Sequence, residues 1–383
     1  MALRLGLFLA LLAGACGDND EPQAGPSSGP PTAPTESAAA APTTAVPRTQ
    51  VPPTTTAPSR PSPQRPVEAQ VLTAGLEVPW GLVFLPDGSA LVGERDTARL
   101  HRVRPDGSRT RVADVPGVVP QGEGGLLGLA VAPSYRTDRW VYAYFTAAED
   151  NRVVRFRLER PGEQQVLLSG IPKASNHNGG RLAFGPDGML YVGTGDASEP
   201  GRSQDRDSLG GKVLRLRPTG GAAPGNPFGS PVWSLGHRNV QGLAFDRAGR
   251  LWATEFGQNT WDEVNLITRG GNYGWPEVEG RGTSGGRYLS PKVVWSTSEA
   301  SPSGVAFGGG ELHVAALRGR RLWDVPLRGT SAGEPTARFR GDYGRIRTVA
   351  LEPGGRALWL TTSNCDGRGD CGDRKDLVAR VPL

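Results

Sequence analysis

Thiols are scarce in this sequence, which holds only three cysteines among 383 residues. Two of them, Cys365 and Cys371, lie in the short segment SNCDGRGDC, with no other metal-binding thiol or imidazole nearby. Because a metal site needs more ligands than two thiols, no metal is predicted here. The spacing instead favours a disulfide, provided that the chain reaches an oxidising compartment. The intervening Arg368–Gly369–Asp370 is expected to be only a glycine-rich turn.

Dense runs of one charge are also absent. The formal net charge is +5, but the lysines and arginines are scattered along the chain. Nucleic-acid binding requires a basic stripe or patch, so no nucleic-acid partner is predicted. The excess of arginine suits an anionic small molecule better.

The apolar run at the N-terminus, Leu5 to Leu12, is too short to cross a bilayer as a permanent helix. It follows the basic Arg4 and ends in the small residues before Cys16, which is typical of a secretory signal peptide. A cysteine in this position resembles a bacterial lipobox, so residues 1–15 are predicted to be a lipoprotein signal peptide. Cys16 would then carry a lipid and anchor the protein at the outer face of the cell membrane. An ordinary cleaved signal with an incidental cysteine is the alternative.

Pro, Thr, Ala and Ser dominate residues 16–66. A segment of this composition cannot bury an apolar core and stays extended and solvated. We therefore expect a disordered tether, followed by one folded domain over residues 67–383.

Cys16→Ser is expected to release the protein from membranes, because it removes the lipid attachment and leaves the tether and the folded domain unchanged. Cell fractionation and immunoblotting measure the change, with Ser27→Ala in the tether as a control that stays on membranes. Wild-type protein in the soluble fraction would contradict the lipobox interpretation.

One pattern recurs six times in the folded part of the chain. Each copy has a short apolar strand, a turn such as Pro-Asp-Gly, and a second strand of alternating apolar residues, which is typical of a β-hairpin. The copies recur at intervals of roughly 45–60 residues, the range of a four-stranded propeller blade with loop insertions. They begin at Pro79, Gly124, Gly179, Val240, Pro302 and Arg345.

The repeats predict an all-β, six-bladed β-propeller of four-stranded antiparallel blades. A closed ring leaves few free sheet edges, so a strand near Gln70–Leu76 or Leu377–Val381 should complete a blade begun at the other terminus. The first strand of each blade would line a central channel. Polar residues in the glycine-rich approaches to these strands are then expected to converge on one rim. Two separate β-sandwiches fit less well, because the repeat continues without a linker.

His177 is the candidate general base among four histidines. It lies in KASNHNGGRL, just before a repeat begins, and histidine side chains titrate near neutral pH. A hydrogen-bonded loop histidine without a catalytic role is the alternative. His101 and His313 lie in strand-like runs and are interpreted as structural, and His237 as support for its neighbours.

Four arginines, Arg238, Arg318, Arg345 and Arg347, stand near the ends of predicted strands. Arginine binds carboxylates in a bidentate fashion, so four on one rim would suit a ligand with several carboxylates. The stretch EFGQNTWDEVNLI, followed by GGNYGWP, adds acidic residues and turn carbonyls. These are the oxygen ligands that a hard cation such as Ca²⁺ prefers.

An ordered set of motifs across residues 70–383 resembles the soluble glucose/sorbosone dehydrogenase family, whose members use pyrroloquinoline quinone (PQQ). The motifs are GEGGLLGLA, NHNGGRLAFGPDG, YVGTGD, GHRNVQGLAF, DEVNLI with GGNYGWP, SPSGVAF and GRIRTVAL. The resemblance implies PQQ-dependent oxidation of aldoses to lactones, with a sugar substrate and a separate electron acceptor.

The resemblance also implies roles for single residues. His177 would take the proton of the anomeric hydroxyl while hydride passes to the C5 carbonyl of the quinone. Asp196 would orient His177. Arg238 and Asn239 would contact the quinone carbonyl, with Arg238 steadying its developing negative charge.

Further cofactor contacts follow from the same resemblance. Arg345 and Arg347 match arginines that hold cofactor carboxylates. Glu123 stands where well-known members have Gln, and Arg318 stands where they have Lys. The charge of Glu123 is expected to weaken PQQ binding or to change which sugar fits.

Calcium is the second implied cofactor. Main-chain carbonyls of Gly257 and Gln258 would hold a catalytic Ca²⁺, and Gln258 replaces a Pro, which a main-chain ligand tolerates. Glu263 and Tyr273 resemble a second, structural calcium site. Short loops favour a compact enzyme of broad aldose specificity.

Two other functions stay open at this point. The first is a propeller that has lost its chemistry and binds carbohydrate or protein partners. The second is a metal-dependent lactonase, which would need several carboxylates around one ion in the channel. Only Glu123 and Asp196 are obvious candidates for that role.

Overall fold

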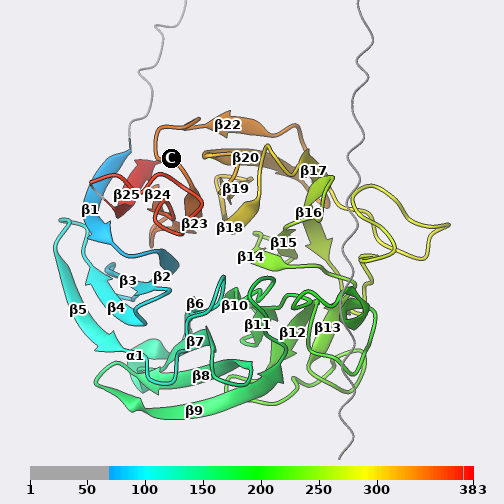
Figure 1. Cartoon of the computed structure of the whole chain (residues 1–383), viewed down its shortest axis with the longest axis horizontal. Helices are drawn as coiled ribbons and strands as arrows, with labels where there is room; N and C mark the ends of the chain where they lie inside the picture. Colours follow the sequence, from blue (N-terminus) through cyan, green and yellow to red (C-terminus); the bar gives the residue numbers. More distant parts are fainter. Residues whose placement is uncertain (1–68, 374) are drawn as a thin grey trace, which may run out of the picture. The chain divides into compact units, whose positions relative to one another are not determined.

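The structure is a computed structural model and describes residues 69–373 and 375–383. Six antiparallel sheets stand as blades around a central axis (Figure 1). Within the described ranges the helices are a single turn, α1 (Tyr135–Asp138), and a 3₁₀ turn, η1 (Pro200–Ser203), neither long nor apolar enough to cross a membrane. The predicted all-β six-bladed propeller is therefore confirmed. The predicted signal peptide and tether, with Cys16, lie outside the described residues.

Each blade starts with its innermost strand and proceeds outward. The first three blades are β2 (Pro79–Phe84), β3 (Ala90–Glu94), β4 (Arg99–Val103) and β5 (Arg109–Asp114); β6 (Leu126–Val131), β7 (Val141–Thr146), β8 (Asn151–Arg157) and β9 (Arg160–Ile171); and β10 (Leu182–Phe184), β11 (Leu190–Gly193), β12 (Lys212–Leu216) and β13 (Val232–Leu235). The next two are β14 (Val240–Phe245), β15 (Leu251–Glu255), β16 (Trp261–Ile267) and β17 (Val293–Ser296); and β18 (Pro302–Gly308), β19 (Glu311–Ala316), β20 (Arg321–Arg328), β21 (Ser331–Ala332) and β22 (Thr336–Arg338). The sixth is β23 (Ile346–Leu351), β24 (Ala357–Thr362), β25 (Asp376–Pro382) and β1 (Gln70–Leu76).

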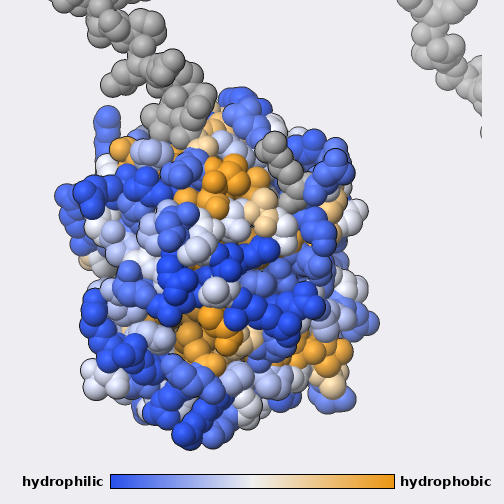
Figure 2. Space-filling model, turned by 90° about the vertical axis from the view of Figure 1, so that its left-hand side faces the viewer, coloured by the Kyte–Doolittle hydropathy of each residue, from blue (hydrophilic) through white to orange (hydrophobic). Residues whose placement is uncertain are grey.

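The two ends of the folded chain meet in the sixth blade. Strand β1 pairs with β25 in antiparallel register, with Gln70 opposite Arg380. The N-terminal strand therefore forms the outer edge of a blade whose other strands are C-terminal, as expected for a closed ring (Figure 1). Figure 2 views the ring from this side, where the surface is largely hydrophilic with smaller hydrophobic patches.

The fifth blade departs from the predicted four strands. Both β21 and β22 pair with β20, the first at Leu327 and Arg328 and the second at Leu322 to Asp324. This sheet therefore has five strands. The long β20 provides the reason, because its far end extends beyond β22 and pairs with the short β21.

Apolar side chains between neighbouring blades form the core. Large buried residues include Trp80, Trp252 and Trp359, one from each of three blades. Successive strands of a blade run in opposite directions, so every second loop lies on the same rim of the propeller. The loops that lead into the inner strands and the loops between the second and third strands share one rim, and this rim carries the candidate site.

Candidate active site

His177 lies on the loop between β9 and β10 and is held by a carboxylate. Its Nδ1 is 2.7 Å from Oδ1 of Asp196, on the loop between β11 and β12. Asp196 is fully buried and also accepts hydrogen bonds from the Trp275 indole (2.9 Å) and the Ser198 amide (2.8 Å). Burial alone would raise the pKa of Asp196, but the bonds from His177 and Trp275 hold it below its usual value. An ionised Asp196 binds the Nδ1–H tautomer, which leaves Nε2 to accept a proton.

The backbone of the two loops is shaped for this pair. His177 itself has a φ of +55°, in the left-handed region. A Cβ at Gly195 would stand 1.9 Å from the His177 carbonyl oxygen, so only glycine lets the loops approach this closely. The pairing of His177 with Asp196 therefore depends on the missing side chain at Gly195 as well as on the two side chains themselves.

Asn239 and Arg238 follow in the loop before β14. Asn239 is fully buried, and its Oδ1 accepts hydrogen bonds from the Gly179 amide (3.0 Å) and from Gln241 (3.1 Å). Its Nδ2 has no partner among the described residues. The Arg238 guanidinium donates through Nε (2.8 Å) and Nη2 to the side-chain oxygen of Gln258. The Gln258 side chain therefore holds Arg238 in place, which the sequence did not indicate.

Two buried arginines concentrate positive charge in the channel. Arg347 on β23 donates to Gln241 (3.1 Å) and Ser303 (3.3 Å), and its Nε has no partner within residues 69–373 and 375–383. Arg181 donates to the Gln241 carbonyl (2.8 Å). Burial lowers the pKa of both Arg347 and Arg181 to about 9, so both stay charged at neutral pH. Burying such charges is costly without anionic partners.

Few carboxylates offset this charge. Asp366 accepts a hydrogen bond from Arg345 (2.9 Å) and lies 3.9 Å from Arg347. Glu123 lies on the approach to β6 and pairs with Arg368 at 2.6 Å. Burial would raise the pKa of Glu123, but the Arg368 guanidinium holds it below its usual value. Arg368 therefore neutralises the charge by which Glu123 was predicted to weaken cofactor binding.

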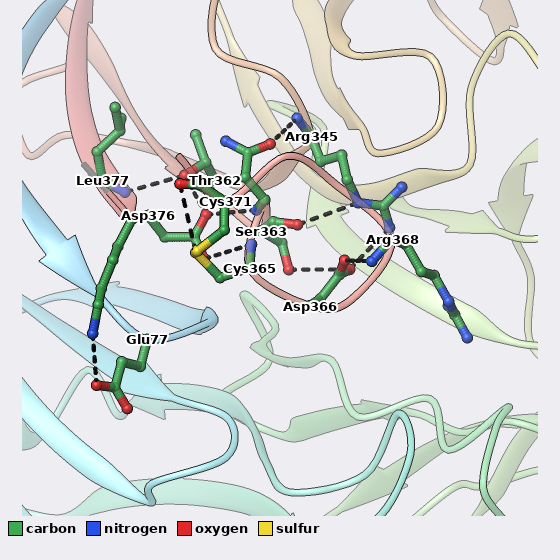
Figure 3. Close-up of a disulfide and its surroundings, with 12 residues drawn as sticks. Glu77, Arg345, Thr362, Ser363, Cys365, Asp366, Arg368, Cys371, Asp376 and Leu377 are labelled. Carbon is green, nitrogen blue, oxygen red and sulfur yellow. Dashed lines mark hydrogen bonds and ion pairs between the residues drawn. A yellow bond between two sulfur atoms is a disulfide. The ribbon is translucent and has the colours of Figure 1, made fainter. Parts of the chain in front are cut away.

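A narrow recess opens among these residues. It is lined by Trp80, Glu123, Asn178, Gly179, Gln241, Phe256, Arg347 and Arg368. Arg368 does more than occupy a glycine-rich turn, which corrects the interpretation made from sequence. The disulfide between Cys365 and Cys371 is confirmed and closes the loop that carries it (Figure 3).

The loop between β15 and β16 presents two main-chain carbonyls. One carboxylate oxygen of Glu279 accepts hydrogen bonds from four successive amides, those of residues 258 to 261, at 2.7–3.1 Å. In a trans peptide the C=O points opposite to the N–H, so the carbonyls of Gly257 and Gln258 point away from Glu279. Neither carbonyl accepts a hydrogen bond within the described part of the chain. Two fixed, unpaired carbonyl oxygens suit a hard cation.

Glu263 and Tyr273 line a neighbouring narrow recess, together with Arg238, Glu255 and Glu279. Burial, and then the nearby Glu255 carboxylate, raise the pKa of Glu263 to about 8. The Tyr273 hydroxyl donates to the Leu266 carbonyl at 2.6 Å, so its main-chain oxygen is the atom left for a cation. The structure thus brings both predicted residues together.

Arg318 differs from the other predicted site residues. It lies on the turn between β19 and β20, on the same rim, with an exposed side chain. It is not among the residues that line the recess within the described part of the chain. The other predicted residues contact one another directly or through one intervening residue, whereas Arg318 stands apart. They are Glu123, His177, Asp196, Arg238, Asn239, Gly257, Gln258, Arg345 and Arg347.

The other three histidines do not line the recess. His237 is fully buried between Ser234 and Glu255, with both ring nitrogens 2.9 Å from their partners. His313 on β19 bonds Asp324 at 2.6 Å. His101 lies buried on β4.

The residues present fit a planar anion with several carboxylates, such as PQQ. Asn239 Nδ2 and Arg347 Nε are buried donors that have no partner in the described part of the chain. Arg345 and Arg347 supply charge, and Trp80 and Phe256 supply aromatic walls. Sequence reasoning missed Trp80, Gln241 and Trp275. The first two lie on inner strands β2 and β14, so extending the search from the approach loops into these strands would have found them.

The family model described as glucose/sorbosone dehydrogenase matches residues 76–371. This region contains every residue of the candidate site. Among solved structures, the PQQ-bound aldose sugar dehydrogenase of Streptomyces coelicolor is 53% identical, with a TM-score of 0.79 over 83% of this chain and 99% of that chain.

Two relatives that are named sugar dehydrogenases are also similar to this chain. The aldose sugar dehydrogenase of Escherichia coli is 30% identical over 337 residues, which cover 77% of this chain and 90% of that protein. Quinoprotein glucose dehydrogenase B of Acinetobacter calcoaceticus is 34% identical over 256 residues, or 56% of this chain. The match spans 53% of that relative's length.

Proposed function

Since the chain belongs to the glucose/sorbosone dehydrogenase family, we propose that it oxidises aldoses at the anomeric carbon and releases the corresponding lactones. It is an oxidoreductase, a PQQ-dependent sugar dehydrogenase. A compact site of this kind would accept a range of aldoses.

One observation supports the proposal above the others. The half-buried His177 and the buried Asp196, joined at 2.7 Å, stand beside a recess whose inner wall carries the charged Arg347. A proton acceptor next to an anion-binding recess is the arrangement that removal of a hydride and a proton from an alcohol requires. A binding module would have no use for the buried carboxylate behind His177.

Each residue then has a defined task. His177 Nε2 accepts the proton of the anomeric hydroxyl, and Asp196 fixes its tautomer and steadies the imidazolium that forms. The C1–H pair of electrons leaves as hydride, so C1 gains its carbonyl bond and the lactone results. When bound, PQQ supplies the two-electron acceptor for this hydride. Arg238 would stabilise the negative charge of a reduced acceptor, and Arg345 and Arg347 would hold its carboxylates.

Calcium is part of the proposal. The free carbonyls of Gly257 and Gln258 would hold one ion, which would polarise the acceptor carbonyl as a Lewis acid. Glu263 and the main-chain oxygen of Tyr273 would bind a second, structural ion. The raised pKa of Glu263 supports this second site, because a buried carboxylate beside Glu255 favours either a proton or a cation.

The setting of the enzyme is also a proposal. A lipid on Cys16 would hold it at the outer face of the cell membrane, and a separate electron acceptor would re-oxidise the cofactor there. The Cys365–Cys371 disulfide supports an oxidising compartment of this kind.

The test of the proposed function uses purified full-length protein stripped of cofactor and metal. Addition of PQQ and calcium is expected to give dye reduction that depends on the aldose, across a panel of sugars. Omission of PQQ is the control. Bound PQQ without turnover of any aldose would contradict the proposal and favour a carbohydrate-binding module.

Calcium is expected to stabilise the protein more at pH 8.5 than at pH 6. The pKa of Glu263 rises to about 8 in the metal-free fold, above the value of about 4.3 in an unfolded chain. Between about pH 4.3 and pH 8 the folded state therefore binds one more proton than the unfolded chain. The stability that this proton gives the metal-free fold is lost as the pH rises toward 8. Calcium must displace that proton at pH 6, whereas at pH 8.5 the carboxylate is already ionised.

Thermal unfolding with calcium and with chelator, at both pH values, measures this effect. A rise of several degrees at pH 8.5 and a clearly smaller one at pH 6 are expected. Glu263→Gln should remove the pH dependence of the gain. Equal gains at the two pH values would contradict the assignment of Glu263.

A further inference from the structure

We propose that Arg368, on the disulfide-closed loop between β24 and β25, is a further contact for the carboxylates of the bound quinone, and that the Cys365–Cys371 disulfide holds it over the recess. This inference rests on the proposed function. It assigns a binding task to a loop that sequence reasoning treated as a turn.

The loop is folded directly onto the arginines of the channel. Asp366 accepts a hydrogen bond from Arg345 (2.9 Å) and another from the Arg368 amide (3.0 Å), as Figure 3 shows from the side of the loop. A Cβ at Gly369 would stand 2.7 Å from both Arg345 Cδ and the Asn364 carbonyl oxygen. Glycine is therefore required at 369 for the loop to lie against Arg345.

Arg368 is the loop residue that reaches the recess. It lines the recess with Arg347 and Gly179, and its Nη1 donates to Glu123 at 2.6 Å. This contact joins the sixth blade to the approach of the second blade. The Arg368 side chain is 58% exposed, and Glu123 uses only one of its five N–H donors. The other donors are available to an incoming carboxylate without loss of the Glu123 contact.

Charge gives Arg368 a second effect. Glu123 borders the recess, and its carboxylate would repel a ligand with several carboxylates if it stood alone. Arg368 neutralises that charge. It thereby accounts for how the recess accommodates the charge of Glu123, and it adds to the attraction exerted by Arg345 and Arg347.

The disulfide restricts the loop to the conformation that presents Arg368. Other contacts hold the base of the loop: Asp376 accepts hydrogen bonds from Thr362 (2.8 Å) and from the Asn364 amide (2.5 Å). Loss of the disulfide should therefore loosen residues 366–370 and leave the blade intact. A loop that is ordered only on binding weakens affinity, because the ordering entropy opposes association.

The experiment is a direct titration of PQQ into metal-loaded full-length protein, followed by tryptophan fluorescence. Arg368→Gln is expected to weaken binding about tenfold or more, and Arg368→Lys less, because it keeps the charge. Adding Glu123→Gln to Arg368→Gln should restore part of the affinity, because it removes a negative charge that is no longer neutralised by an arginine. Arg104→Gln, in the turn after β4 on the opposite rim, is the matched control.

The disulfide is tested by Cys365→Ser with Cys371→Ser, with thermal unfolding to check the fold. This variant is expected to bind PQQ several-fold more weakly, and Arg368→Gln should add little in its background, because the two changes act on one contact. Unchanged PQQ affinity in Arg368→Gln would overturn the inference while the proposed function stands. A changed KM for sugar with unchanged PQQ affinity would overturn it as well. Wild-type protein that fails to bind PQQ would instead refute the proposed function.

Discussion

Replacement of His177 by glutamine is expected to slow sugar oxidation at least about a hundredfold, within the usual cost of losing a general base. Glutamine has a similar reach, but it cannot accept a proton at neutral pH. The anomeric hydroxyl must lose its proton as hydride departs, and His177 is the histidine held by a buried carboxylate beside the recess. The binding of PQQ and calcium should be unchanged, because His177 is assigned to neither.

Steady-state dye reduction at saturating PQQ measures this effect, with fluorescence titration of PQQ beside it. His237→Gln serves as a comparison, because its buried ring should affect thermal stability first. A His177→Gln enzyme that keeps most of its activity would refute the mechanism.

Arg238→Ala and Arg347→Ala are expected to fail in different ways. Arg238 acts on charge that grows in the transition state, so its loss should lower kcat about a hundredfold, the usual cost of removing one such donor. Arg347 binds a carboxylate present throughout the reaction, so its loss should mainly weaken PQQ binding, also about a hundredfold. The fold should tolerate Arg347→Ala, because the change removes one of two buried like charges in the channel.

Separate measurement of kcat and PQQ affinity distinguishes these roles. Gln258→Ala supplies a graded control, because it leaves Arg238 in place but removes the oxygen that accepts its Nε and Nη2 bonds. Its kcat should fall between those of the wild type and Arg238→Ala. If both alanine variants only weaken PQQ binding and keep kcat at saturation, the assignment fails.

The fold was largely predictable because its signals are local. Each blade can be recognised in the sequence as a hairpin with an apolar strand and a glycine-containing turn. The pairing of β1 with β25 follows from the need to close a ring. The extra pairing of β21 with β20 was not predictable, since a two-residue strand has no periodicity to read.

The candidate site was predictable where a residue precedes an inner strand, as His177, Arg238 and Arg345 do. It was not predictable where the role depends on a distant partner. Arg368 pairs with Glu123, 245 residues away, and no local pattern links the two. Glu279 accepts hydrogen bonds from four amides of another loop, and this depends on the backbone conformation of that loop, which the sequence composition does not reveal.

The closure of the ring also has a consequence for biosynthesis. Strand β1 leaves the ribosome before all other strands of the ring, whereas its partner β25 is made last. Until β25 exists, β1 has no ladder to join and the sixth blade cannot form, so a nascent chain remains without its native closure. Pairing between such distant segments is also intrinsically slow. In the export proposed above, such late closure would keep the polypeptide unfolded long enough to pass through a translocation channel.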